Sequence, residues 1–123
     1  MAFIRSGSGG VSEINYSTTE HVIGTWIDGK PLYEKTIDFG TLPNTTTKQV
    51  DHGLTNFVIR DLKGIAVDSS TNTTFPLPYV GGGASFDSYI NIYVDSTKIN
   101  IMSFTDRRVF YAYVTLIYTK TTD

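Results

Sequence analysis

The stretch Thr25-Trp26-Ile27-Asp28-Gly29-Lys30-Pro31-Leu32-Tyr33 contains the strongest turn signal of the chain and its only tryptophan. Asp28-Gly29 stands between two β-favouring runs, His21 to Ile27 and Leu32 to Phe39. A type I′ turn needs positive φ at both central residues, which Asp-Gly adopts at little cost. The stretch therefore predicts a β-hairpin with Asp28-Gly29 at its tip. Pro31 then falls at an edge position, and Trp26 is expected to be a packing anchor rather than a ligand platform.

The composition extends this prediction to the whole chain. Thr, Tyr, Val, Ile and Phe dominate, while Ala, Leu, Glu, Gln and Met are scarce. Branched and aromatic side chains lose rotamer freedom in a helix but pack well on a pleated sheet. We therefore expect almost no helix.

Alternating apolar and polar residues predict five strands besides the hairpin. They are Thr46 to Asp51, Phe57 to Val67, Tyr89 to Val94, Lys98 to Phe104, and Val109 to Thr119. A bend or bulge is expected at Lys63-Gly64. Thr74 to Val80 contains two prolines, so it must be extended but cannot be a central strand.

These elements predict an all-β fold, an antiparallel β-sandwich of meander or jelly-roll-like type. The connections between the last three strands are too short for parallel crossovers, so we expect an antiparallel meander there. With 123 residues the chain fits one domain. Residues 1–12 include Ser6-Gly7-Ser8-Gly9-Gly10 and are expected to be a flexible lead-in, with the single β-sandwich domain at 13–123.

The last predicted strand is apolar or aromatic on both faces. Phe110, Ala112, Val114, Leu116 and Tyr118 share one face, while Val109, Tyr111, Tyr113 and Ile117 share the other. One face of an antiparallel sheet normally meets water. The second face is therefore expected either to be covered inside the sandwich or to contact a partner chain, and we favour a homo-oligomer.

No pattern in the sequence points to catalysis, a metal or a cofactor. The chain has no Cys, and His21 and His52 are far apart without the spacing of a metal site. A G-x-S-x-G nucleophile elbow is missing, and several Asp residues fall in predicted turns, where backbone reasons favour them. We therefore expect a protein that is not an enzyme and carries no cofactor.

Charge and hydropathy exclude two classes of partner. The formal net charge is −2, whereas a nucleic-acid-binding protein usually has a basic face. No apolar run approaches the roughly 18 residues needed to cross a bilayer. We expect neither nucleic-acid binding nor membrane insertion.

Two loops are candidates for binding. Gly81-Gly82-Gly83 lacks the Lys-Ser/Thr and the helix of a phosphate loop, so it is either a plain flexible loop or an adaptable contact loop. Tyr79 and Phe86 flank it and can stack on a sugar or contact a protein. Arg107-Arg108 forms a basic turn, either solvated or in contact with an anion. The candidate binding residues are therefore Tyr79, Gly82, Phe86, Arg107 and Arg108.

The segment from Tyr16 to Thr36 reads YSTTEHVIGTWIDGKPLYEKT and resembles a block that recurs in phage and prophage structural proteins. The steps Gly40-Thr41-Leu42-Pro43-Asn44 and Val50-Asp51-His52-Gly53 are similar to the turns that follow it. The ending YTKTTD, residues 118–123, is similar to the terminus of the same proteins. Residues 69–88 have no counterpart in this resemblance.

The resemblance implies a C-terminal, often trimeric, module of a tail-fibre, head-fibre or baseplate protein. Its expected partners are two further copies of itself, other virion proteins, and a bacterial surface polysaccharide or protein. Such a protein assembles in the host cytoplasm and is exposed on the virion. The alternatives are a purely structural trimerisation or capsid-decoration module, and a carbohydrate-binding module of a depolymerase.

Overall fold

The computed structural model describes residues 16–80 and 88–123. Within these ranges the regular structure is β, and no α-helix occurs, so the prediction of an all-β fold is confirmed. The predicted lead-in, residues 1–12, lies outside the described residues. The strands are β1 (His21–Thr25), β2 (Pro31–Thr41), β3 (Thr47–Asp51), β4 (Phe57–Asp68), β5 (Thr73–Leu77), β6 (Ile90–Val94), β7 (Lys98–Ser103) and β8 (Tyr111–Lys120).

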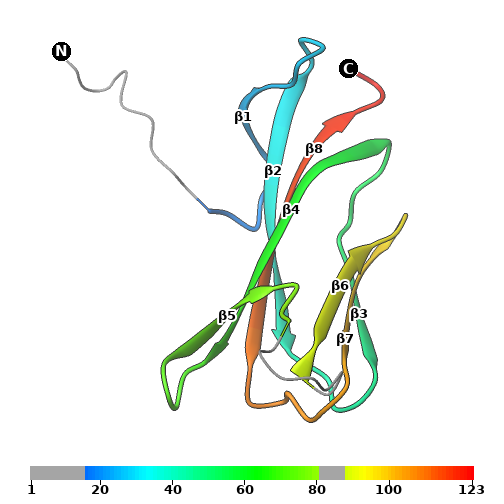
Figure 1. Ribbon diagram of the computed structural model, residues 1–123. Helices are drawn as coiled ribbons and strands as arrows, with labels where there is room; N and C mark the ends of the chain where they lie inside the picture. Colours follow the sequence, from blue (N-terminus) through cyan, green and yellow to red (C-terminus); the bar gives the residue numbers. More distant parts are fainter. Residues whose placement is uncertain (1–15, 81–87) are drawn as a thin grey trace, which may run out of the picture.

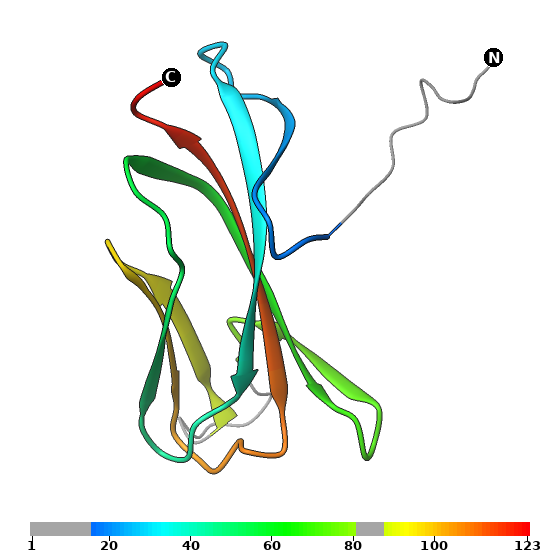
Figure 2. The same cartoon turned by 180° about the vertical axis from the view of Figure 1, so that it is seen from behind.

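The strands form two antiparallel sheets that lie face to face (Figure 1). The larger sheet has the order β1-β2-β8-β4-β5 and the smaller one the order β3-β7-β6. The smaller sheet covers only the lower part of the larger sheet in this view, and Figure 2 shows the same arrangement from behind. The β1–β2 hairpin, the start of β4 and the end of β8 project beyond it.

The hydrophobic core lies between the two sheets. Every second residue from Phe110 to Tyr118 points into it and is at most 7% exposed, as the alternation predicted. Ile90, Ile99 and Ile101 of the smaller sheet belong to the same cluster and are fully buried. Each such side chain contributes roughly 1.5–3 kcal/mol relative to an exposed one. The contact between the sheets is thus built mainly on β8 and β7.

The predicted hairpin is present, but its turn differs from the prediction. The Gly29 N–H donates to the Trp26 carbonyl, and the Trp26 N–H donates to the Lys30 carbonyl, both at 2.9 Å. Gly29 has φ +88°, whereas Asp28 is not in the left-handed region. The tip is therefore a three-residue loop with glycine at its left-handed position. The Asp28 carboxylate accepts the Lys30 N–H at 3.0 Å, which supports this loop from the side chain.

β5 lies at an edge of the larger sheet, so the prediction that its proline-containing segment is not a central strand is confirmed. The predicted bulge at Lys63-Gly64 is wrong, because the register of β4 against β8 shifts between Ile59 and Asp61. The extra residue is Arg60. Its guanidinium lies 4.8 Å from the Trp26 ring centre and its Nε donates to the Thr119 hydroxyl, contacts that an ordinary register would not place together.

The predicted meander holds for β6 and β7, which form a hairpin, but not for β7 and β8. After β7 the chain crosses to the larger sheet, where β8 lies between β2 and β4. This position gives β8 a hydrogen-bonded neighbour on each side and places its apolar inner face against β7. If β7 and β8 formed a hairpin, they would lie side by side in one sheet, and the inner face of β8 could not pack against β7.

The second face of β8 is covered over one part of its length and open over the other. Towards the end of the strand, Thr115 and Ile117 are 7% and 9% exposed. Towards its start, Tyr111 and Tyr113 are 52% and 44% exposed. The open part lies on the outer face of the larger sheet, which turns away from the smaller sheet.

Candidate binding face

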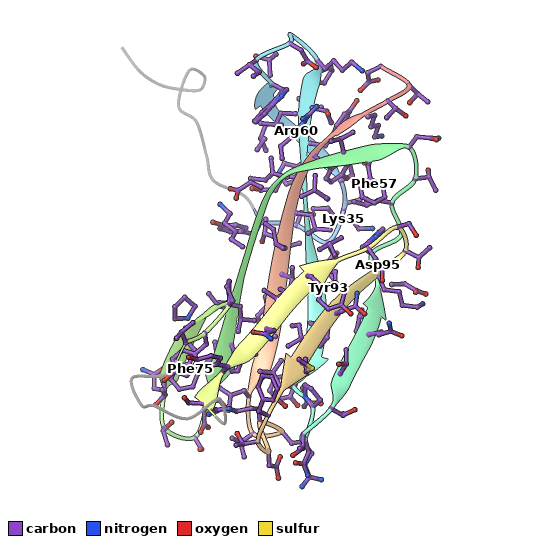
Figure 3. All side chains as sticks on the ribbon, turned by 45° about the vertical axis from the view of Figure 1, so that its right-hand side comes forward. Lys35, Phe57, Arg60, Phe75, Tyr93 and Asp95 are labelled. Atoms are coloured by element: carbon purple, nitrogen blue, oxygen red, sulfur yellow. The ribbon has the colours of Figure 1, made fainter. Side chains whose placement is uncertain are left out.

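Two of the sequence-predicted binding residues, Tyr79 and Arg107, lie together at the β5 end of the molecule. The Tyr79 ring stacks on Phe75 with 4.0 Å between centroids, and Phe75 stacks on Phe110 at 4.9 Å. The Arg107 guanidinium lies 5.7 to 5.9 Å from the centres of these three rings. Figure 3 shows Phe75 at this end of the molecule and Arg60 at the opposite end.

This cluster holds the chain on both sides of residues 81–87. Tyr79 pairs with Ile90 through two backbone hydrogen bonds of 3.0 and 2.9 Å, and Arg107 Nη2 donates to the Ser88 carbonyl at 3.0 Å. Both side chains are half-buried. Their contacts therefore give Tyr79 and Arg107 a supporting role, in which they connect the end of β5 and the start of β6 to the segment before β8.

The other predicted residues do not join this cluster. Arg108 is exposed and pairs with Asp106, at 2.9 Å from Nε to Oδ1 and 2.7 Å from Nη2 to Oδ2. Hydrogen bonds from the Arg108 side chain and backbone lower the pKa of Asp106 to about 2. Gly82 and Phe86 lie outside the described residues.

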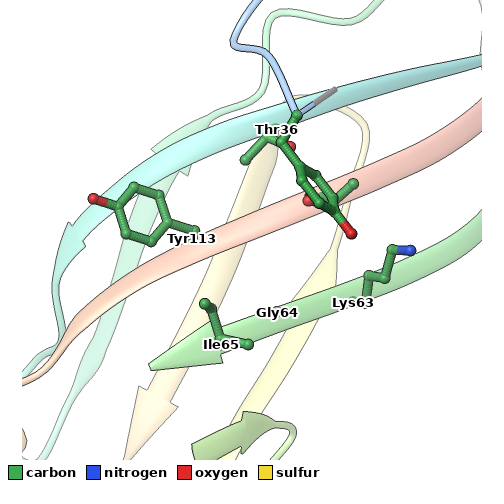
Figure 4. Close-up of a pocket in the computed structure, with 7 residues that line it drawn as sticks. Thr36, Lys63, Gly64, Ile65 and Tyr113 are labelled. Carbon is green, nitrogen blue, oxygen red and sulfur yellow. The ribbon is translucent and has the colours of Figure 1, made fainter. Parts of the chain in front are cut away.

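The outer face of the larger sheet contains a hollow that the sequence did not reveal. It has a volume of about 360 Å³. Register explains its composition, because Ile65 of β4 lies directly across from Tyr113 of β8, and Lys63 lies across from Thr115. Thr36 of β2 faces Thr115 from the other side. The lining residues are Tyr16, Thr36, Lys63, Gly64, Ile65, Tyr113 and Thr115 (Figure 4).

The hollow combines apolar walls with a few polar groups. The Tyr113 and Tyr16 rings and the Ile65 side chain supply the apolar surface. The Thr36 and Thr115 hydroxyls are 2.9 Å apart, so one of them donates to the other and both keep further hydrogen-bonding capacity. Within the described ranges, Lys63 is the charged residue of the lining. A small number of polar groups on a largely apolar surface is typical of ligand sites.

The sequence pointed to only part of this site. The double-sided pattern of β8 marked Tyr111 and Tyr113 as an apolar face that needs an explanation. Lys63 and Tyr16 carried no such signal, because they reach the hollow through strand register and through the path of the chain before β1. No spacing rule along the chain connects these positions.

A second hollow lies where the sandwich opens beyond the smaller sheet. Its volume is about 750 Å³, and its walls come from the loop before β4 and from the β6–β7 turn, including Phe57 and Asp95. Figure 3 shows both labelled side chains on this side of the molecule. An adjoining space of about 290 Å³ contains Glu20 and Lys120, which form an ion pair at 2.6 Å. The Glu20 carboxylate and the Lys120 ammonium group in this space are therefore already paired with each other.

The two histidines have structural partners. His52 is buried; its Nδ1 accepts the Leu54 N–H at 3.0 Å and its Nε2 lies 2.9 Å from the Asp95 carbonyl. His21 lies 3.3 Å from the Glu34 carboxylate. Within residues 16–80 and 88–123, no three side chains of the His, Cys, Asp or Glu type gather as metal ligands. The same ranges contain no helix long and apolar enough to span a bilayer.

Comparison with known proteins returned no relative. No protein family, no curated protein and no solved structure matches this chain.

Proposed function

We propose that this chain is a tip module of a phage fibre, that it forms a homotrimer, and that it attaches the virion to a bacterial surface. The strongest support comes from the projecting end of the larger sheet. Val22, Ile23 and Ile27 are 59%, 43% and 92% exposed there. Exposed aliphatic side chains gathered at one end of a domain are typical of a contact with another protein chain.

The position of β1 adds to this argument. β1 is an edge strand of the larger sheet, so it has a strand neighbour on one side only within the described residues. An edge strand with apolar side chains invites pairing with another chain unless it is covered. A second copy seated along β1 would cover this edge together with Val22 and Ile23. The number of three copies rests on the resemblance to fibre modules.

The outer face of the larger sheet is the surface that we assign to adhesion. Tyr111 and Tyr113 lie on the central strand β8, whose opposite face belongs to the hydrophobic core, so this face has a packed support. A trimer would display three such faces at once. Linked sites raise the apparent affinity by about 10² to 10⁴ without any new contact, so a weak interaction with a surface polymer would be enough.

A purely structural role in fibre assembly or capsid decoration is the second candidate. The exposed hairpin end favours it as much as it favours adhesion, because both roles need self-association. The two candidates differ in whether the isolated module binds cells.

The test uses a fluorescent fusion of the chain on a panel of bacterial strains. We expect retention on at least one strain, and Ile27→Lys should reduce the apparent affinity at least about tenfold by removing multivalency. Thr71→Lys, on an exposed turn away from the hairpin, is the matched control and should bind like the unmodified fusion. Failure to bind any strain at about 10 μM would contradict adhesion and favour the structural role.

A further inference from the structure

In the described part of the chain, the lining of the outer-face hollow carries a single charge, that of Lys63. Lys63 is exposed, and within the described residues no hydrogen bond or ion pair engages its ammonium group. Among residues 16–80 and 88–123, no carboxylate lines the hollow. A cation whose ammonium group is not engaged by a side chain of the described residues favours an anionic ligand group, because opposite charges attract.

Three carboxylates of the described residues lie on this face of β2 and β4, and each has a partner on its own or a neighbouring strand: Glu34, which is buried beside His21, and Asp38 and Asp61. Asp38 lies across from Tyr113 and accepts the Gly40 N–H at 3.1 Å. Asp61 precedes Lys63 by two residues on β4 and accepts the Leu62 N–H at 2.9 Å. Both are exposed and lie outside the lining of the hollow.

The shape and chemistry of the walls fit a sugar ring. Figure 4 shows the Tyr113 ring on one side of the hollow, with Ile65 and Lys63 along β4 and Thr36 on β2. A tyrosine ring offers an apolar face and a hydroxyl, which suits a pyranose with an apolar C–H face and polar edges. The Thr36–Thr115 pair can exchange hydrogen bonds with ring hydroxyls. A volume of about 360 Å³ is at the small end of ligand sites.

We propose that this hollow binds a carboxylate-bearing sugar, of the uronic or sialic acid class, within a bacterial surface polysaccharide. The ring stacks on Tyr113, its hydroxyls meet Thr36 and Thr115, and its carboxylate pairs with Lys63. This inference rests on the adhesion function proposed above, since it names the ligand of the same face.

The test is a titration followed by amide NMR shifts and calorimetry. The probes are oligogalacturonate and α2,8-linked oligosialate, with maltotriose as the neutral comparison. We expect an acidic probe to shift the amides of Lys63, Ile65 and Tyr113 and to bind at least about tenfold more tightly than maltotriose. Its affinity should fall with added salt, because the ammonium of Lys63 is exposed.

Variants separate the parts of the proposal. Lys63→Gln should remove the preference for acidic probes, and Tyr113→Ala should remove binding of all of them. Tyr93→Ala, which removes an exposed tyrosine from the smaller sheet, should bind like the original chain. Unchanged melting temperatures confirm that the variants are folded. No acidic probe binding at about 10 mM, or binding that survives both variants, would overturn the inference.

Comparing cell retention with probe binding separates a failure of the sugar site from a failure of the proposed adhesion function. Cells that retain the fusion equally after Lys63→Gln and Tyr113→Ala would leave adhesion intact and overturn the hollow as its site. Probe binding without retention on any cell would support the hollow and contradict adhesion.

Discussion

His52 joins two loops of the sandwich through both nitrogens of its ring. Nδ1 accepts the Leu54 N–H, so Nε2 carries the proton and donates to the Asp95 carbonyl. The ring also meets Phe57 edge-on, with 5.0 Å between centroids. The His52 side chain thus links the segment after β3 to the β6–β7 turn through hydrogen bonds.

We predict that His52→Ala lowers the free energy of unfolding by about 3 kcal/mol. The substitution leaves the Leu54 N–H without its acceptor and opens a cavity beside Phe57. His21→Ala is the control, because His21 is only half-buried and should lose less than about 1 kcal/mol. Urea unfolding measures the free energy of unfolding of both variants. An equal loss in the two variants would contradict the role of His52 in linking these loops.

Glu20 connects the segment before β1 to the end of β8. Its carboxylate accepts hydrogen bonds from the Tyr118 hydroxyl and the Lys120 ammonium, both at 2.6 Å. Burial alone would raise the pKa of Glu20, but hydrogen bonds from Lys120 and Tyr118 outweigh it and lower the pKa. Burial, with Glu20 next to it, also raises the pKa of Tyr118.

The lowered pKa of Glu20 gives a predicted pH dependence. Because the folded-state value lies below the usual 4.5, the stabilisation is complete above pH 4.5 and is lost as the pH falls through the lower folded value. Glu20→Gln should therefore cost about 1 kcal/mol at pH 7, discounted for partial exposure, and nothing near pH 2. Asp51→Asn is the control, because Asp51 forms only a surface ion pair with Lys98. A difference for Glu20→Gln that is independent of pH would contradict this assignment.

At the scale of elements, the β1–β2 hairpin depends on one backbone conformation. Gly29 has φ +88°, and a Cβ added there would meet nothing within 4 Å. Any cost of a side chain therefore comes from the backbone and not from crowding.

We predict that Gly29→Ala lowers the free energy of unfolding by about 1 kcal/mol. Gly29→Asn should recover most of this loss, because asparagine tolerates left-handed φ better than alanine. Thermal unfolding followed by circular dichroism measures both variants. An alanine variant as stable as the original, or an asparagine variant no better than alanine, would contradict the loop geometry.

The strands were predictable because their signals are local. The alternation of residues along β8 predicted which of its side chains point inward, and Asp28-Gly29 predicted the position of the hairpin. The sheet to which β8 belongs was not predictable, because alternation reports which faces are apolar and not which strands pair. The bulge at Arg60 was not predictable either, because the residues that Arg60 contacts, Trp26 and Thr119, lie far away in sequence.

The candidate site was predictable only in part. Tyr111 and Tyr113 were marked by the two-faced pattern of β8, whereas Lys63 enters the hollow through its pairing with Thr115. Tyr79 and Arg107 were singled out as binding residues of two separate loops, but in the structure the Arg107 guanidinium lies over the Tyr79 ring. Aromatic and cationic residues in loops are equally suited to binding and to support, and the sequence does not separate these uses.

At the scale of the whole molecule, apolar surface is left at two separate places. The projecting hairpin carries Val22, Ile23 and Ile27, and the outer face carries Tyr111 and Tyr113. We assign the first to contact between copies and the second to the bacterial surface. In the proposed trimer, this division would leave the hollow that we propose as a sugar site open.

Light scattering on the purified chain after size exclusion tests the central claim of self-association most directly. The chain has a mass of 13.6 kDa, and we predict a species of three times that mass. Ile27→Lys together with Val22→Thr should shift it to the monomer, while Thr71→Lys should leave it unchanged. A mass of 13.6 kDa for the unmodified chain at micromolar concentration would contradict the account.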